Sequence, residues 1–207
     1  MKIIFIGPPG SGKGTQSEII SKKYDIPKIS SGDLLRNQNK NENQILMQKG
    51  YLIDDHIITK MILKRLNNKD CLNGFILDGF PRTLCQAKYI RHICIDFIFD
   101  LYIPEKLILP RISGRLIHKI SGKIYHINDT FQSNFKLNEK NHMLKKRTDD
   151  CNNTLKIRIQ EYNKNYVLLH DFYEQQTLKK KLKYHIIDAS LTIDQIHENI
   201  NKILINN

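Results

Sequence analysis

The stretch Gly7-Pro8-Pro9-Gly10-Ser11-Gly12-Lys13-Gly14-Thr15 decides the fold of this 207-residue chain. It follows a run of apolar residues at 3–6 and precedes a helix-length segment at 15–24. Glycines at these positions let successive backbone N–H groups turn inward around a phosphate, and the following helix adds its positive end. Lys13 supplies a mobile charge for the outer phosphate oxygens. The stretch therefore predicts a phosphate-binding loop between a strand and a helix.

Beyond this loop, the chain alternates between short apolar runs and helix-length segments. Residues 3–6, 75–77, 97–102 and 184–187 are apolar on consecutive positions, which indicates strands buried on both faces, and 26–29 is a weaker candidate. Helices are expected at 15–24, 54–66, 83–92, 104–116, 154–173 and 192–205. Pro110 should kink the fourth of these just before Arg111. The alternation predicts an α/β P-loop fold of three layers, with a central parallel sheet of five strands.

Composition restricts the class of protein only in part. The chain has 33 Lys and Arg against 21 Asp and Glu, a net charge of +12, which suits a polyanionic partner or an enzyme of phosphorylated substrates equally well. The four cysteines form no CxxC pair, and no apolar run is long enough to span a bilayer. We therefore expect a reduced, cytoplasmic setting, and no export signal ahead of the first strand.

A second motif, Leu77-Asp78-Gly79-Phe80-Pro81-Arg82-Thr83, follows the second apolar run. Ligands of parallel α/β folds collect at the carboxyl ends of the strands. Asp78 is there expected to serve Mg²⁺ or its waters, with a turn or helix-cap role as the alternative. Arg82 offers a planar fork that suits a phosphate better than lysine would. The motif thus predicts a second anion site near the loop.

Two stretches, 31–53 and 114–150, do not fit the alternation of strands and helices. We interpret both as insertions into the core, which in a kinase would be the moving parts. The second is polar and poor in strand-forming residues, so a disordered surface loop is the alternative interpretation.

The strings PPGSGKGT at 8–15 and LDGFPRT at 77–83 resemble those of the adenylate kinases, within the P-loop nucleoside monophosphate kinases. This resemblance implies reversible transfer of the terminal phosphoryl group of Mg-ATP to AMP, giving two ADP, in purine nucleotide interconversion and energy homeostasis. It implies a core of 1–29, 54–113 and 151–207, an AMP-binding insertion at 30–53 and a lid at 114–150. The partners expected are ATP, AMP and ADP, without nucleic acid or membrane, and the chain is expected to be a monomer.

The resemblance also implies an ATP site, composed of Gly10, Ser11, Gly12, Lys13, Gly14, Thr15, Arg115, Ile124, Tyr125 and Leu191. Ile124 and Tyr125 belong to the string 121–126, which resembles the hairpin of the lid. Because Gly14 displaces the loop hydroxyl to Thr15, Mg²⁺ is expected to be held through water near Asp78, with no direct protein ligand. No cysteine lies in 114–150, so we expect no zinc.

An AMP site is implied in the same way, at Ser31, Arg36, Tyr51, Leu52, Ile53, Gly79, Phe80, Pro81, Arg82, Gln86, Arg147 and Arg158. Ser31, where the family usually has threonine, should contact the nucleotide, Arg36 its phosphate and Gln86 the adenine edge. Taken alone, a glutamine on a helix is usually only solvated.

Arginine usage supports this prediction. The chain has eight arginines, and six of them fall where the resemblance implies phosphate or nucleotide contacts: Arg36, Arg82, Arg111, Arg115, Arg147 and Arg158. Phosphoryl transfer spreads negative charge over equatorial oxygens, so a site needs positioned cations. The predicted catalytic set is therefore Lys13, Asp78, Arg82, Arg111, Arg115, Arg147 and Arg158.

Three alternatives remain open. A UMP or CMP kinase generally has a short lid, and the long insertion here argues against it. A P-loop hydrolase or nucleotide switch would need a water-positioning residue rather than a second phosphate site at Arg36 and Arg82. A basic nucleic-acid-binding module is weakened by the lack of an aromatic-basic motif and of tryptophan.

Overall fold

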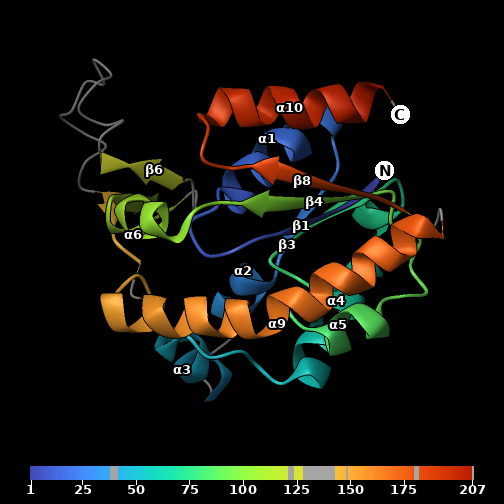
Figure 1. Ribbon diagram of the computed structural model, residues 1–207. Helices are drawn as coiled ribbons and strands as arrows, with labels where there is room; N and C mark the ends of the chain where they lie inside the picture. Colours follow the sequence, from blue (N-terminus) through green and yellow to red (C-terminus); the bar gives the residue numbers. More distant parts are fainter. Residues whose placement is uncertain (38–41, 121–123, 128–142, 148, 180–181, 207) are drawn as a thin grey trace.

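The computed structural model describes residues 1–37, 42–120, 124–127, 143–147, 149–179 and 182–206. Its central sheet has five parallel strands in the order β2-β3-β1-β4-β8 (Figure 1). These are β1 (Lys2–Ile6), β2 (Lys28–Ser30), β3 (Phe75–Asp78), β4 (Phe97–Tyr102) and β8 (Lys183–Asp188). The predicted α/β fold with a five-stranded parallel sheet is confirmed, including the weak strand candidate at 26–29.

Helices cover both faces of this sheet (Figure 1). On one face lie α1 (Lys13–Tyr24) and α10 (Ile193–Ile205), and on the other lie α4 (Asp55–Leu66), α5 (Leu84–Tyr89) and the long α9 (Asn152–Leu178). A short 3₁₀ turn, η1 (Lys69–Cys71), precedes β3. The arrangement gives the three layers expected from the alternation of strands and helices.

The core consists of two clusters, one on each side of the sheet. Alternate residues of a strand point to opposite faces, so Ile3 packs in the cluster that contains Ile20 of α1. Its neighbour Ile4 packs in the other cluster, with Ile62 of α4 and Leu169 of α9. Because the central strands are buried on both faces, they are apolar on consecutive positions.

One burial prediction was wrong. The run at 184–187 was expected to be buried on both faces, but β8 is an edge strand of the sheet and Ile186 is 56% exposed. Ile187, which points to the opposite face, is buried in the cluster with α10. An apolar run can therefore mark an edge strand, one face of which is only partly covered, by packing at Tyr184 but not at Ile186.

The prediction of a kinked helix at 104–116 was also wrong. A 3₁₀ turn, η2 (Glu105–Leu107), is followed by a separate short helix, α6 (Ile108–Ser113). Pro110 is the third residue of α6, where a backbone N–H has no acceptor within the helix, so no hydrogen bond is lost. The predicted helix at 83–92 is shorter, and the one at 154–173 is longer, than the patterns indicated.

The two predicted insertions contain structure of their own. Between β2 and α4 lie α2 (Ser31–Arg36) and α3 (Glu42–Lys49). Between α6 and α9, a small antiparallel sheet has the order β6-β5-β7, with β5 (Arg115–His118), β6 (Ile124–His126) and β7 (Leu144–Lys145). Of the hairpin predicted at 121–126, residues 121–123 lie outside the described residues.

Within the described ranges, no helix combines the length and the apolar character needed to cross a bilayer.

Candidate functional site

The glycine-rich loop joins the end of β1 to the start of α1 and owes its shape to its backbone. Gly7, Gly10 and Gly12 have φ angles of 139°, 77° and 91°, which side chains of L-residues rarely permit. A Cβ at Gly7 would lie 2.6 Å from the Leu101 carbonyl oxygen, so the loop also lies directly against β4. Glycine is therefore required here by conformation and by space.

Lys13 begins α1 and turns back over this loop. Its Nζ donates hydrogen bonds to the carbonyl oxygens of Gly7 and Pro8, both at 2.7 Å, and to Ser11 Oγ at 3.3 Å. Burial lowers the pKa of Lys13 to about 8, opposed by the attraction of Asp78 and assisted by the repulsion of Arg82. The loop thus holds a weakly solvated cation on neutral acceptors.

Asp78 lies beside the same loop. It is the last residue of β3, in register with Phe5 of β1, and its Oδ2 lies where a Cβ on Gly14 would approach it to 3.3 Å. The same Cβ would lie 3.6 Å from Ile124 Cδ1 of the small sheet. A carboxylate and an apolar side chain therefore border the start of α1.

The turn after β3 collects the residues of the second motif. The carbonyl oxygen of Gly79 accepts hydrogen bonds from Ser31 Oγ and from Arg82 Nε, both at 2.7 Å. Gly79 has a φ of 71°, and a Cβ there would lie 3.0 Å from the Arg82 guanidinium. The structure thus brings Ser31 to Arg82, although they lie 51 positions apart.

All the predicted arginines except Arg111 form a cluster, in which carboxylates hold several of them. Arg158 pairs with Asp149, and the Arg36 guanidinium lies 3.6 Å from the same carboxylate. Arg115 pairs with Asp150, with 2.8 Å between its Nε and Oδ2. The Arg36 guanidinium is also 2.5 Å from Asp33 Oδ1.

Repulsion among these cations is substantial. Burial lowers the pKa of Arg147 to about 10, with Arg36 and Arg115 as the next causes. The pKa of Arg82 is likewise lowered to about 10, first by desolvation of its guanidinium and then by Arg158, although much of its side chain is exposed. So dense a group of positive charges suits a ligand with several negative charges.

Comparison with known proteins shows the family of the chain. The family model described as adenylate kinase matches residues 5–178. The chain belongs to the adenylate kinase family. It is 46% identical to an adenylate kinase of Wigglesworthia glossinidia brevipalpis, over 99% of both chains. It is 43% identical to one of Buchnera aphidicola subsp. Baizongia pistaciae, over 100% of this chain and 99% of the relative. Adenylate kinases are nucleoside monophosphate kinases, so the chain is a phosphotransferase.

Gln86, which the resemblance to adenylate kinases assigned to the adenine edge, is not a solvated helix residue. It is 2% exposed. Its Oε1 accepts from the Arg82 backbone N–H at 2.7 Å, and its Nε2 donates to Asp55 Oδ1 at 2.7 Å. Both ends of the amide are therefore engaged, and the predicted contact with adenine remains a prediction.

The other residues that the resemblance assigned to AMP differ in exposure. Tyr51 is 48% exposed and Leu52 is half-buried, whereas Ile53 and Phe80 belong to the core. Pro81 is buried as well. The side chains of Ile53 and Phe80 are therefore occupied in the packing of the core.

Arg111 and Leu191 are brought together, but away from the arginine cluster. The Arg111 guanidinium donates to the carbonyl oxygens of Ser190 and Leu191 at 3.3 Å. Burial lowers the pKa of Arg111, opposed by Asp188. Among the described contacts, Arg111 has none with the other predicted arginines.

Tyr125 lies on β6, where it pairs with Leu116 of β5.

The sequence interpretation missed the acidic partners of the site. Asp149 and Asp150 neutralise arginines, and Asp55 holds Gln86. A signal for the first two was present, because they are the last two residues of the second insertion and come shortly after Arg147. Asp55 lies 31 residues from Gln86, and no local pattern connects the two.

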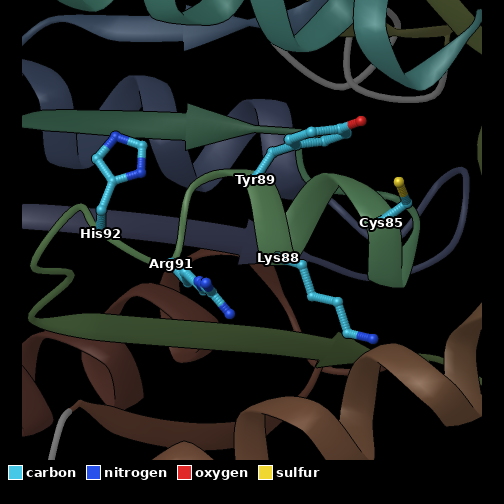
Figure 2. A pocket seen from close by; sticks show the side chains of 5 residues that line it. All are labelled: Cys85, Lys88, Tyr89, Arg91 and His92. Atoms are coloured by element: carbon cyan, nitrogen blue, oxygen red, sulfur yellow. The ribbon is translucent and has the colours of Figure 1, made fainter.

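Of two surface cavities, one shares lining residues with the predicted site and the other does not. One, of about 420 Å³, includes the predicted Arg115 and Arg147 in its lining, together with Ile112, Ser113, Lys146, Asp150, Cys151 and Asn152. The other, of about 560 Å³, is lined by Cys85, Lys88, Tyr89, Arg91 and His92 around α5. Figure 2 shows that these five side chains point in different directions rather than towards one centre. None of them was predicted for the site.

Proposed function

We propose that the chain catalyses reversible transfer of the terminal phosphoryl group of Mg-ATP to AMP, giving two ADP, and so interconverts purine nucleotides. The observation that supports this most directly is the closeness of two anion sites. The charges of both Arg82 and Arg115 act on Lys13 of the glycine loop. A donor phosphate at the loop and an acceptor phosphate at the arginines would then be neighbours, as direct transfer requires.

The donor site of the proposal is the loop with its flanks. Backbone N–H groups of 10–15 and the Lys13 amine would hold the ATP phosphates, because a helix start and a cation favour negative charge. Ile124, Tyr125 and Leu191 would border the rest of the nucleotide. The contact of Ile124 with the position of Gly14 supports a role of the small sheet in covering the loop.

The acceptor site of the proposal lies across the Gly79 turn. Arg36, Arg82, Arg147 and Arg158 would bind the AMP phosphate, and Ser31, 51–53, 79–81 and Gln86 would surround the nucleoside. Asp149 pairs with Arg158 and lies near Arg36. Phosphate would replace this carboxylate, since a phosphate offers more charge and more acceptors to the same guanidinium groups.

Catalysis would depend on charge and on exclusion of water. The arginines and Lys13 would stabilise the charge on the equatorial oxygens of the transferring group, and AMP's own phosphate would be the nucleophile, so no protein base is needed. Closure of the insertions would keep water from accepting the phosphoryl group. Arg111, anchored to Ser190 and Leu191, would act at the edge of this site.

The proposal includes Mg²⁺ but not zinc. The Asp78 carboxylate beside Gly14 fits a water-bridged Mg²⁺, because carboxylates and waters are the ligands this ion prefers. When bound, Mg²⁺ would neutralise charge on the ATP phosphates. No cysteine is present in 114–150, which removes the usual thiolate ligands of a structural zinc.

For organisation, we propose a core of 1–29, 54–113 and 151–207, an AMP-binding segment at 30–53 and a lid at 114–150. The small antiparallel sheet supports the lid, and the two short helices between β2 and α4 support the AMP-binding segment. The proposed state is a cytoplasmic monomer whose partners are nucleotides rather than nucleic acid or membrane. All four cysteines are free, which agrees with a reducing compartment.

A coupled assay of ADP formation from ATP tests the function, with AMP, UMP, CMP and GMP as acceptors in turn. We expect turnover with AMP to exceed that with every other acceptor. Faster transfer to UMP or CMP would replace the proposal with the pyrimidine kinase alternative. ATP hydrolysis that is independent of any acceptor would favour the hydrolase alternative.

A further inference from the structure

Asp55, the first residue of α4, connects two elements of the proposed acceptor site. Its Oδ1 accepts a hydrogen bond from Gln86 Nε2 at 2.7 Å, and its Oδ2 accepts one from Thr83 Oγ1 at 2.8 Å. The neighbouring Asp54 caps α4 instead, accepting from the backbone N–H groups of His56 and Ile57. Because Asp54 already serves as the cap, the contacts of Asp55 are not needed to begin the helix.

The contacts of Asp55 fix the orientation of the Gln86 amide. A carboxylate only accepts hydrogen bonds, and a backbone N–H only donates one. The amide nitrogen must therefore face Asp55, and the amide oxygen must face the Arg82 N–H. A flipped amide would place oxygen against carboxylate and NH₂ against N–H. Chemistry thus leaves one orientation.

Asp55 also joins the two sides of the proposed base pocket. Thr83, which donates to Asp55, is the N-cap of α5 and accepts from the Gln86 backbone N–H at 3.1 Å. Residues 51–53, the proposed backbone side of the pocket, end two positions before Asp55. Ring contact between His56 and Tyr89, with centroids 5.0 Å apart, gives α4 and α5 a second connection.

We propose that Asp55 is a positioning residue that makes the acceptor site select a base with adenine's hydrogen-bonding edge, by holding the Gln86 amide in one orientation. This inference rests on the proposed function. An amide nitrogen has two hydrogens and an amide oxygen two lone pairs, so each end of Gln86 can make one further hydrogen bond. The two ends offer a donor and an acceptor in a fixed order.

That order distinguishes two purine edges. Adenine presents an N6–H donor next to an N1 acceptor, whereas hypoxanthine presents an O6 acceptor next to an N1–H donor. An amide held by Asp55 matches one pattern and opposes the other. An amide released from Asp55 turns more readily and accepts either. Asp55 would therefore determine specificity without touching the base.

Acceptor selectivity tests this inference. We would measure kcat/KM with AMP and with IMP at saturating ATP for the wild type and for Asp55→Ala. Loss of a hydrogen bond to a charged partner should lower the AMP-to-IMP ratio by about ten-fold. The change should appear mainly as a higher KM for AMP, because Asp55 contacts no transferring group.

The conservative variant Asp55→Asn separates orientation from charge. Its carbonyl oxygen can still accept from Gln86 while its NH₂ donates to Thr83 Oγ1. We expect it to keep the AMP-to-IMP ratio within about two-fold of the wild type. A loss in Asp55→Asn as large as that in Asp55→Ala would overturn the inference, because orientation would then not be the cause.

Asp54→Ala is the matched control. It removes the cap of α4, so it should lower the melting temperature and leave the selectivity ratio unchanged. If Asp55→Ala is unfolded at the assay temperature, Asp55→Ser takes its place, since serine suits a helix start but is too short to hold the amide. A wild-type AMP-to-IMP ratio in the truncated variant would refute this inference and leave the proposed function standing. A wild type that does not phosphorylate AMP would refute the proposed function first.

Discussion

The glycine loop and the arginine cluster are held in two different ways. The loop is shaped by backbone angles at Gly7, Gly10 and Gly12, and its Lys13 rests on neutral carbonyl oxygens. The arginines are held by side chains of opposite charge, with Asp149 and Asp150 among them. Under the proposed function, a phosphate would therefore enter a preformed loop on one side, whereas on the other it would have to displace carboxylates.

The loop therefore depends on the shape of its backbone, whereas the arginine cluster depends on the pairing of opposite charges. In the loop, removing a side chain should change the chemistry without changing the fold. In the cluster, removing a carboxylate should lower the stability of the fold, because buried cations lose a partner of opposite charge. The predictions below test each half of that contrast, beginning with the largest expected effect.

Lys13→Ala should leave the fold intact and lower phosphoryl transfer by roughly 10²–10³-fold, the loss typical of a missing positioned donor. The glycine backbone sets the shape of the loop, so the melting temperature should not fall. Coupled assays and thermal melting followed by circular dichroism check both parts. Undiminished activity would remove Lys13 from the mechanism, and a collapse of the fold would show that the loop is not shaped by its backbone.

Asp149→Asn should destabilise the protein by about 3 kcal/mol, because Asp149 is buried and its removal leaves Arg158 only the more distant carboxylate of Asp150, 3.9 Å away. Burial, the largest single cause, raises the pKa of Asp149, but the hydrogen bond and charge of Arg158 together with the charges of Arg36 and Arg147 outweigh it and hold the pKa below its usual value. A carboxyl group whose pKa is lower in the folded than in the unfolded chain stabilises the fold at pH values above its unfolded pKa of about 4. This stabilisation is lost as the pH falls through the folded pKa. Urea unfolding of the wild type and of Asp149→Asn at pH 7 and pH 3 measures this stabilisation. The difference in unfolding free energy between the two proteins should be smaller at pH 3.

Asp33→Asn is the matched control for this prediction. It removes another carboxylate partner of Arg36, but the Asp33 side chain is 51% exposed. Exposed ion pairs contribute little, so the change should stay within about 0.5 kcal/mol. Equal effects of Asp33→Asn and Asp149→Asn would mean that burial does not distinguish the two pairs.

The same contrast explains how much the sequence could predict. The strands and the loop were predicted because each depends on a local pattern, such as consecutive apolar residues or closely spaced glycines. The arginines were predicted from the resemblance of the chain to a known family. Pairings across the fold carry no such pattern. The contact of Asp55 with Gln86 exists only because α4 and α5 pack together. The edge position of β8 likewise depends on strand order, which an apolar run does not encode.

The smallest effect expected concerns the protonation of Lys13. Its pKa of about 8 means that the free enzyme loses this charge as the pH rises through that value. Log kcat/KM for ATP should then fall by about one per pH unit, whereas the decline in kcat should begin at higher pH, because bound phosphates favour the charged amine. Coinciding declines in kcat and kcat/KM would argue against this assignment.

The stability of the fold should change with the protonation of Lys13 in the opposite direction to the activity. The folded pKa of Lys13, about 8, lies below the unfolded value of about 10.4, so the unfolded chain binds more protons between them. The contribution of Lys13 to the free energy of unfolding therefore rises with pH in this window, while activity falls. The difference in unfolding free energy between the wild type and Lys13→Ala, followed across this pH window, isolates the contribution of Lys13. A difference that stays constant from pH 7 to pH 10 would mean that the amine is not desolvated, and the loop would then hold a solvated cation like any surface lysine.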